Sequence, residues 1–237
     1  MKKTTIISGL LLSTLINAQT FAPNPGAQTG SVNTGFARGG SVLASDPTDL
    51  STIGQDSIAC RNSDEGAHAD NSYWRFFDID GLGEIEITDV DIGIQTSVGG
   101  GGGGTQPVVI RIYSIPNGGS LPTATLSLIT ESSTTVGDFE TTVVNFPISA
   151  NLDAATMDLV VEFHTPDATS GGNGGLHNLF IGSNTSPEDN PLFLSSEACG
   201  ITSPTPVGDI GFPDMHGIMV VNGLANVPVE LMNFSIE

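Results

Sequence analysis

The sequence predicts an all-β protein, an antiparallel β-sandwich with a jelly-roll-like arrangement of its strands. Short apolar runs recur along the chain, and Gly, Pro or Asn residues bound them. Several runs alternate apolar and polar residues with the period of two that a strand requires. No amphipathic helix is evident, and the stretch "SANLDAATMD" (149–158) has room for one turn at most. Many short strands without intervening helices are typical of a sandwich.

The first strong strand signals flank a run of glycines. In "IEITDVDIGI" (85–94) the alternation breaks at Thr88–Asp89, where a β-bulge would return the later apolar residues to the same face. "PVVIRIYSI" (107–115) places Val108, Ile110 and Ile112 on one side and Val109, Arg111 and Tyr113 on the other. The six consecutive glycines between these segments predict a flexible, hairpin-type loop, because no helix follows them to form a phosphate site.

Further strands follow in the second half of the chain. "TTVVNFPI" (141–148) and "MDLVVEFH" (157–164) alternate clearly, the second with Asp158, Glu162 and His164 on its polar side. Shorter apolar runs continue the pattern of strands at 179–183, 191–195, 217–223 and 227–236.

The N-terminus reads as a secretory signal peptide over residues 1–18. Lys2 and Lys3 form its positive start, a mainly apolar run follows, and Ala18 supplies a small residue before the expected cleavage point. The apolar run is about half of the roughly 20 residues that a membrane-spanning helix needs. We expect a flexible, Gly- and Pro-rich lead-in over 19–40, a sandwich domain over 41–225, and a final strand or truncated linker over 226–237.

Removal of the signal peptide leaves a strongly acidic protein. Of the six basic residues, only the four arginines remain, and against 26 acidic residues they give a formal charge of −22. Nucleic acids and anionic membranes are therefore excluded as expected partners, because both need a basic surface. The acidity indicates either colloidal solubility or cation binding, with calcium the expected cation outside the cell.

Two cysteines in an exported chain predict one disulfide, between Cys60 and Cys199. Two free thiols are the alternative. A bridge would hold residues 60–80 close to residues 199–217, and both stretches carry His and Asp side chains. We therefore consider a metal site made of His68, Asp70, Asp214 and His216, with hydrogen-bonded loops as the plainer interpretation.

Two other acidic patterns give weaker signals for a metal. "FDIDGLGEIEITD" places Asp78, Asp80, Gly83 and Asp89 at four positions of an EF-hand loop, but its fifth position is a leucine and no helices flank it. The match is poor. Asp89 and Asp91 can share one face of a strand, and a solvated face is the simpler explanation.

No sequence motif points to catalysis. G-x-S-x-G, H-E-x-x-H and C-x-x-C are all absent. We therefore do not expect an enzyme.

The aromatic stretch "SYWRFFDI" (72–79) contains the only tryptophan. As a strand it would place Tyr73, Arg75 and Phe77 on one face and Trp74 and Phe76 on the other. The structural interpretation is a central, covered strand in which Arg75 pairs with a carboxylate. The functional interpretation assigns Tyr73, Trp74 and Arg75 to ligand binding, with Tyr73 or Trp74 stacking against a sugar ring.

These residues also carry a resemblance to a known module. The stretches "GAHADNSYWRFFDID", "VDIGIQT", "QPVVIRIY" and "IGFPDMHGIMVVNG" resemble a β-rich module of bacterial secreted proteins, sometimes attached to peptidase or adhesin-like chains, that has no assigned activity. The resemblance covers roughly residues 55–223.

The C-terminal "VPVELMNFSIE" (227–237) resembles the segment that precedes type IX secretion sorting domains in gliding Gram-negative bacteria. It implies a protein secreted by, or held on the surface of, a Gram-negative bacterium.

Three functions follow in order of preference. The first is a non-catalytic extracellular binding module with a carbohydrate ligand, whose partner is a glycan or another cell-surface component. The second is a structural or adhesive surface protein without a small-molecule site, and the third is a secreted hydrolase.

Overall fold

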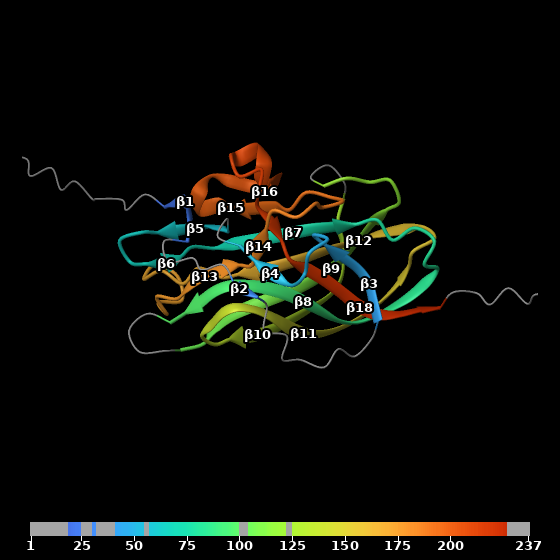
Figure 1. The fold of residues 1–237 in the computed structure, drawn as a ribbon, viewed down its shortest axis with the longest axis horizontal. Coiled ribbons are helices and arrows are strands. Elements are labelled where there is room, and N and C mark those ends of the chain that lie inside the picture. The colour runs from blue at the N-terminus through green and yellow to red at the C-terminus, as the bar shows by residue number, and fades with distance from the viewer. Residues whose placement is uncertain are drawn as a thin grey trace, which may run out of the picture.

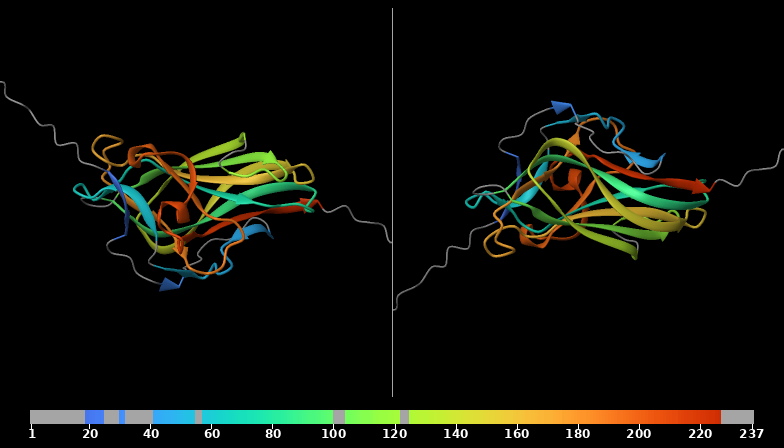
Figure 2. Two further views of the ribbon diagram at one scale, coloured as in Figure 1. Left: turned by 90° about the horizontal axis from the view of Figure 1, so that it is seen from above. Right: turned by 90° about the horizontal axis from the view of Figure 1, so that it is seen from below.

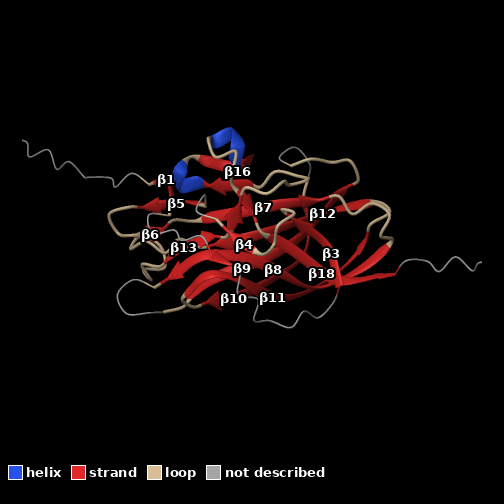
Figure 3. Cartoon of the chain, viewed as in Figure 1, coloured by secondary structure: helices blue, strands red, loops and turns tan. Residues whose placement is uncertain are grey.

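The computed structural model describes residues 19–24, 30–31, 41–54, 57–99, 104–121 and 125–226. The expected signal peptide and the segment 227–237 lie outside these residues. Within them the chain forms an antiparallel β-sandwich, as the sequence predicted (Figure 1). The only helical segments described are two short 3-10 helices, η1 (Glu197–Cys199) and η2 (Val207–Ile210), which lie near β16 (Figure 3). No helix in this part of the chain has the length and apolar character needed to cross a membrane.

The larger sheet has six strands, and the order across it is β10-β9-β12-β7-β15-β16. In that order the strands are Ser127–Val136, Gln106–Pro116, Met157–Thr165, Asn71–Phe77, Phe193–Ser196 and Ile201–Pro206. Strand β7 therefore lies in the interior of the sheet, as its two largely apolar faces predicted.

The second sheet runs in the order β11-β8-β18-β3, and β13 also pairs with β8. These strands are β11 (Phe139–Asp153), β8 (Glu84–Val98), β18 (Met219–Asn226), β3 (Ser41–Asp46) and β13 (Asn178–Ile181). The two layers can be followed from above and below in Figure 2.

Short strands complete the fold. One sheet joins β1 (Thr20–Pro23), β5 (Ile58–Asn62) and β6 (Ala67–His68), and two further pairs are β2 (Gly30–Ser31) with β4 (Thr52–Ile53) and β14 (Ser183–Asn184) with β17 (His216–Gly217). Strands β1 and β2 lie within the segment expected to be a flexible lead-in, so part of that segment is built into the fold.

The chain changes sheets repeatedly, which gives the sandwich its jelly-roll-like character. Strand β8 belongs to one sheet and β9 to the other. The expectation of a hairpin-type loop at the glycine run is therefore wrong, because that loop connects the two sheets.

The core lies between the two sheets and follows the predicted alternation. In β8, Ile85 and Ile87 before Thr88 and Val90, Ile92 and Ile94 after it are buried in one cluster with apolar residues of β9, β11 and β12. Against β18 the register shifts at Asn222/Gly223, opposite Asp89 and Ile87, which leaves Thr88 as the extra residue of a bulge. The predicted bulge is confirmed.

One polar pair is placed differently from expectation. Asp89 and Asp91 share a face, but each is only 3% exposed instead of solvated. The side-chain amides of Asn145 and Asn222 each donate to both carboxylates, at 2.6–3.0 Å. These hydrogen bonds replace the water that a buried carboxylate loses.

The predicted disulfide is present. Cys60 in β5 is bonded to Cys199 in η1, with the two Cα atoms 6.0 Å apart and a sequence separation of 139. The bridge joins the small β1–β5–β6 sheet to the edge of the six-stranded sheet, where β15 and β16 meet.

Candidate functional site

The outer face of the six-stranded sheet carries an aromatic pair that is partly exposed. Trp74 of β7 and Tyr113 of β9 lie on either side of β12, with ring centroids 5.6 Å apart. Both pack against a small buried apolar cluster, separate from the main core, that consists of Ile115, Leu121, Val160 and Phe193. The Trp74 indole N–H donates to Ser195 Oγ of β15 at 3.0 Å. Three strands therefore fix the tryptophan, which leaves a half-buried aromatic surface in a defined orientation.

The carboxylate of Glu162, which lies opposite Trp74 in the sheet register, organises the surrounding polar groups. Glu162 of β12 is 2% exposed and accepts hydrogen bonds from Ser72 Oγ (2.7 Å), Arg111 Nη1 (2.9 Å) and the Tyr113 hydroxyl (2.7 Å). Arg111 also pairs with the exposed Glu131 at 3.1 Å. Because the buried charge has an ionic partner and several donors, the network fixes Arg111 and also Tyr113, whose ring contacts Trp74.

A polar depression lies next to Trp74, on the β15–β16 side. It has a volume of about 300 Å³ and is lined by Asp70, Ser195, Ser196, Glu197, Ile201 and Thr202. Ser195 both lines the depression and accepts the Trp74 hydrogen bond. The Asp70 carboxylate is half exposed and meets Nε2 of His164 at 2.9 Å. The aromatic surface and the polar hollow are thus continuous through one serine, and they form the candidate site.

Of the three residues predicted to bind a ligand, only Trp74 reaches the surface. Tyr73 and Arg75 are 0% exposed on the inner face of β7. The Tyr73 hydroxyl donates to the Ile58 carbonyl at 2.9 Å. The ligand-binding role predicted for Tyr73 and Arg75 is therefore wrong, because the alternation that exposes Trp74 buries its two neighbours.

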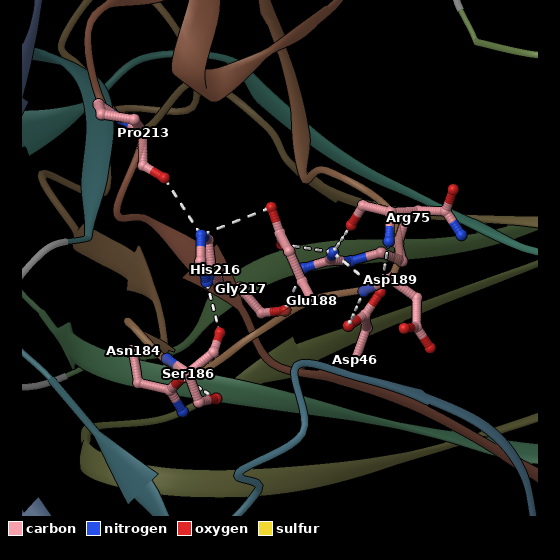
Figure 4. A network of polar contacts seen from close by, with 10 residues as sticks. Asp46, Arg75, Asn184, Ser186, Glu188, Asp189, Pro213, His216 and Gly217 are labelled. Atoms are coloured by element: carbon pink, nitrogen blue, oxygen red, sulfur yellow. Dashed lines mark hydrogen bonds and ion pairs between the residues drawn. The ribbon is translucent and has the colours of Figure 1, made fainter.

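Arg75 has the structural role that was the alternative (Figure 4). Its Nη1 lies 2.7 Å from Glu188 Oε2 and 3.3 Å from Asp46 Oδ2, and its Nη2 donates to the Gly217 carbonyl at 2.7 Å. Nη1 also donates to the Asn190 carbonyl. Arg75 therefore has two carboxylate partners: Asp46 at the end of β3, and Glu188 in the loop before β15.

The structure does not assemble the predicted metal site. His68 is buried with Nδ1 2.8 Å from the His177 carbonyl, and Asp70 pairs with His164. His216 has both ring nitrogens next to carbonyl oxygens, those of Ser186 (2.5 Å) and Pro213 (3.1 Å), as Figure 4 shows. Asp214 lines a different hollow, with Met215. Among the described residues no metal-ligating group unites these four side chains.

The environment of His68 further disfavours a ligand role. Burial lowers its pKa to about 4, against a weaker opposing effect of the hydrogen bond to His177. Its Nε2 is buried without a hydrogen-bond partner among the described residues. His68 is therefore a neutral core side chain whose Nδ1–H donates to a carbonyl.

One serine–histidine pair was not predicted, and it lies in the interior. Ser97 Oγ and His177 Nε2 are 2.9 Å apart, but the residues are 0% and 2% exposed. A hydrolytic nucleophile needs access to its substrate, and this pair has none in the structure.

Sequence reasoning missed Tyr113, Glu162 and Ser195 as parts of the site. The outward orientation of Tyr113 and Glu162 was readable from the alternation of 107–115 and 157–164, whereas the short apolar run 191–195 gave no such signal for Ser195. The proximity of the three residues to Trp74 was not readable, since it depends on the pairings β7–β12, β12–β9 and β7–β15.

The fold and the site together define an all-β sandwich with one disulfide and an aromatic patch on a sheet face. No protein-family model and no curated protein matches the chain. Among solved structures, a clostridial cysteine protease, Cwp84, after propeptide cleavage is similar over 74% of this chain at 15% identity, with a TM-score of 0.41. The chain spans 44% of that protein's length.

Proposed function

We propose that this protein is a non-catalytic extracellular binding module, and that it binds carbohydrate on the outer face of the six-stranded sheet. The observation that carries the proposal is the fixed Trp74–Tyr113 pair beside a polar depression. One disulfide and a strongly acidic chain are consistent with an extracellular setting.

The chemistry of the site favours a sugar over an apolar ligand. A sugar ring offers C–H groups on its faces, which pack against an aromatic ring, and hydroxyls on its rim. The Trp74 and Tyr113 rings supply the aromatic surface, and Asp70, Ser195 and Glu197 line the adjacent depression as acceptors or donors. A long apolar ligand would find this hollow largely polar.

The acidic composition narrows the proposed class of carbohydrate ligand further. The depression contains two carboxylates, of Asp70 and Glu197, and the chain has only four arginines after the predicted cleavage. An anionic polysaccharide would be repelled. Neutral glycans, whose hydroxyls donate to carboxylates, are therefore the proposed class.

The test is a glycan array followed by titration of the hits. Trp74 is the only tryptophan, so intrinsic fluorescence reports directly on the candidate site. We expect neutral glycans to shift or quench this emission in a saturable manner. Trp74→Ala should abolish array binding. Leu224→Ala, which removes an exposed apolar residue from the other sheet, is the control and should bind as the wild type does.

Two outcomes would contradict the proposal. Silence of the whole array would favour a structural or adhesive protein without a small-molecule site. Binding that survives Trp74→Ala would place the ligand elsewhere on the molecule.

A further inference from the structure

Three carboxylates converge where β7 leaves the six-stranded sheet. Asp78 and Asp80 lie in the turn between β7 and β8, and Asp158 is the second residue of β12. One oxygen atom of each lies within 4.8 Å of the others. Continuing the antiparallel register one step beyond the pair Leu159–Phe77 places Asp158 directly opposite Asp78. Like charges in this position destabilise a sheet unless something neutralises them.

No positive side chain in the described part of the chain neutralises this group. Within the described residues, none of the three carboxylates forms an ion pair with an arginine or a histidine. Asp158 is nevertheless 2% exposed. A buried carboxylate that faces two further carboxylates is a costly arrangement without a cation.

Among the described residues, two buried oxygens near these carboxylates have no donor in good hydrogen-bonding geometry. Asp158 Oδ2 accepts from the Gly118 amide at 3.0 Å, but Oδ1 is buried without a partner among the described residues. Asn117 Oδ1 is in the same state, while its Nδ2 donates to Asp80 Oδ1 at 2.5 Å. Buried acceptors without donors are rare in folded proteins and call for an explanation such as an ion.

We propose that Asp78, Asp80 and Asp158 bind a calcium ion, with Asn117 Oδ1 as a further ligand. Calcium takes carboxylate and amide oxygens at about 2.3–2.6 Å, so oxygens on opposite sides of the ion are at most about 5 Å apart. The spacing of the three carboxylates fits this sphere. The group contains no nitrogen or sulfur ligand, which disfavours zinc and other transition metals.

The electrostatics of Asp158 agree with this assignment. Burial raises the pKa of Asp158, and the neighbouring charges of Asp78 and Asp80 raise it further, while the backbone amides of Gly118 and Ile79 lower it. A divalent cation would reverse the repulsion among these groups. The ion would also tie the β7–β8 turn to the start of β12, at the end of the sandwich.

The first experiment is calorimetric titration of the chelator-treated full chain with calcium chloride. We expect saturable binding with a Kd on the order of 10⁻⁴–10⁻³ M, as in extracellular modules. At a free calcium concentration about 100 times Kd, the melting temperature should rise by roughly 5–10 °C. Absence of both heat and shift would overturn the proposal, and so would a response to magnesium as strong as that to calcium.

Isosteric variants distinguish ion binding from a purely structural role. In chelator, Asp158→Asn and Asp80→Asn should melt at or above the wild-type temperature, because each removes like-charge repulsion. In calcium, each should lose the shift and bind at least about tenfold more weakly. Asp209→Asn, at an exposed carboxylate in η2, is the matched control and should keep the full shift. Retention of the shift in Asp158→Asn and Asp80→Asn would contradict the site.

Discussion

Glu188 Oε2 lies 2.7 Å from Nη1 of Arg75, a guanidinium that is completely shielded from solvent. The contact connects the interior of the six-stranded sheet to the loop before β15. Asp46, at the end of β3, makes a second ion pair with the same nitrogen. Arg75 therefore joins three segments that are distant in sequence, and its carboxylate partners replace part of the hydration that the guanidinium loses on burial.

Removal of this guanidinium should be among the most damaging single changes in the chain. Arg75→Met leaves Asp46 and Glu188 without their common counter-charge, and we expect the free energy of unfolding to fall by about 3–5 kcal/mol. Arg75→Lys keeps the charge but not the forked geometry, and should lose less. Urea unfolding measures both losses.

A matched surface pair provides the control for Arg75. Glu131 is 55% exposed at its side chain where it pairs with Arg111. Glu131→Gln should change the unfolding free energy by less than about 1 kcal/mol. An Arg75→Met loss no larger than that of Glu131→Gln would show that the buried network is not a major source of stability.

The disulfide should stabilise the fold mainly by restricting the unfolded chain. It closes a loop of 139 residues, for which the chain-entropy model gives about 5 kcal/mol. The double variant Cys60→Ser/Cys199→Ser should therefore unfold at a clearly lower urea concentration than the oxidised protein. The reduced wild type should match the variant. Equal midpoints for oxidised and reduced protein would contradict this account.

His68 should make the fold less stable in mild acid. Its pKa is about 4 in the folded protein, below the roughly 6.5 expected for an unfolded chain. Between these values the unfolded state binds more protons, so the His68 contribution is complete above about pH 6.5 and is lost as the pH falls toward 4. The shift corresponds to about 3 kcal/mol.

A variant isolates this contribution from that of the carboxylates, which titrate in an overlapping range. His68→Gln removes the titrating ring. Urea unfolding at pH 7 and pH 4.5 should show a steeper loss of stability for the wild type than for the variant. Burial also lowers the pKa of His177, so the variant should retain part of the pH dependence. Identical pH dependence in the two proteins would mean that His68 does not contribute.

The strands were predictable because their signal is local. Alternation identified the buried face of β8, β9, β11 and β12, and even the bulge at Thr88 follows from one break in the period. The same rule separated buried Tyr73 and Arg75 from Trp74 once the inner face was known. The glycine loop was misjudged because sequence adjacency does not reveal whether two strands pair or lie in different sheets.

The candidate sites were less predictable because they depend on which strands pair with one another. Trp74, Tyr113, Glu162 and Ser195 come from four strands whose order is not written in any one of them. The carboxylates of Asp78 and Asp80 were visible as part of a poor EF-hand match, but Asp158 arrives from β12. The disulfide fixes only the distance between Cys60 and Cys199. His68 and His216, which follow them in sequence, contact different partners, so the bridge does not bring the two histidines together.

The two tyrosines should resist ionisation as long as the protein is folded. Burial raises the pKa of Tyr73, and the pKa of Tyr113 rises through burial and through its hydrogen bond to Glu162. These are the only tyrosines in the chain, so absorbance at high pH reports on them alone. We expect no tyrosinate signal up to about pH 11, where a solvated phenol with a pKa near 10 is largely ionised.

Glu162→Gln then tests whether this carboxylate holds the aromatic pair in place. The neutral amide removes the charge that opposes ionisation of Tyr113, so one of the two tyrosines should titrate at lower pH than in the wild type. Tyr73 should stay silent, because its hydroxyl bonds to the Ile58 carbonyl in the core. Glu131→Gln, which leaves the Tyr113 hydrogen bond intact, should titrate as the wild type does. If Tyr113 titrates in Glu162→Gln at the same pH as in the wild type, Glu162 does not organise the proposed binding surface.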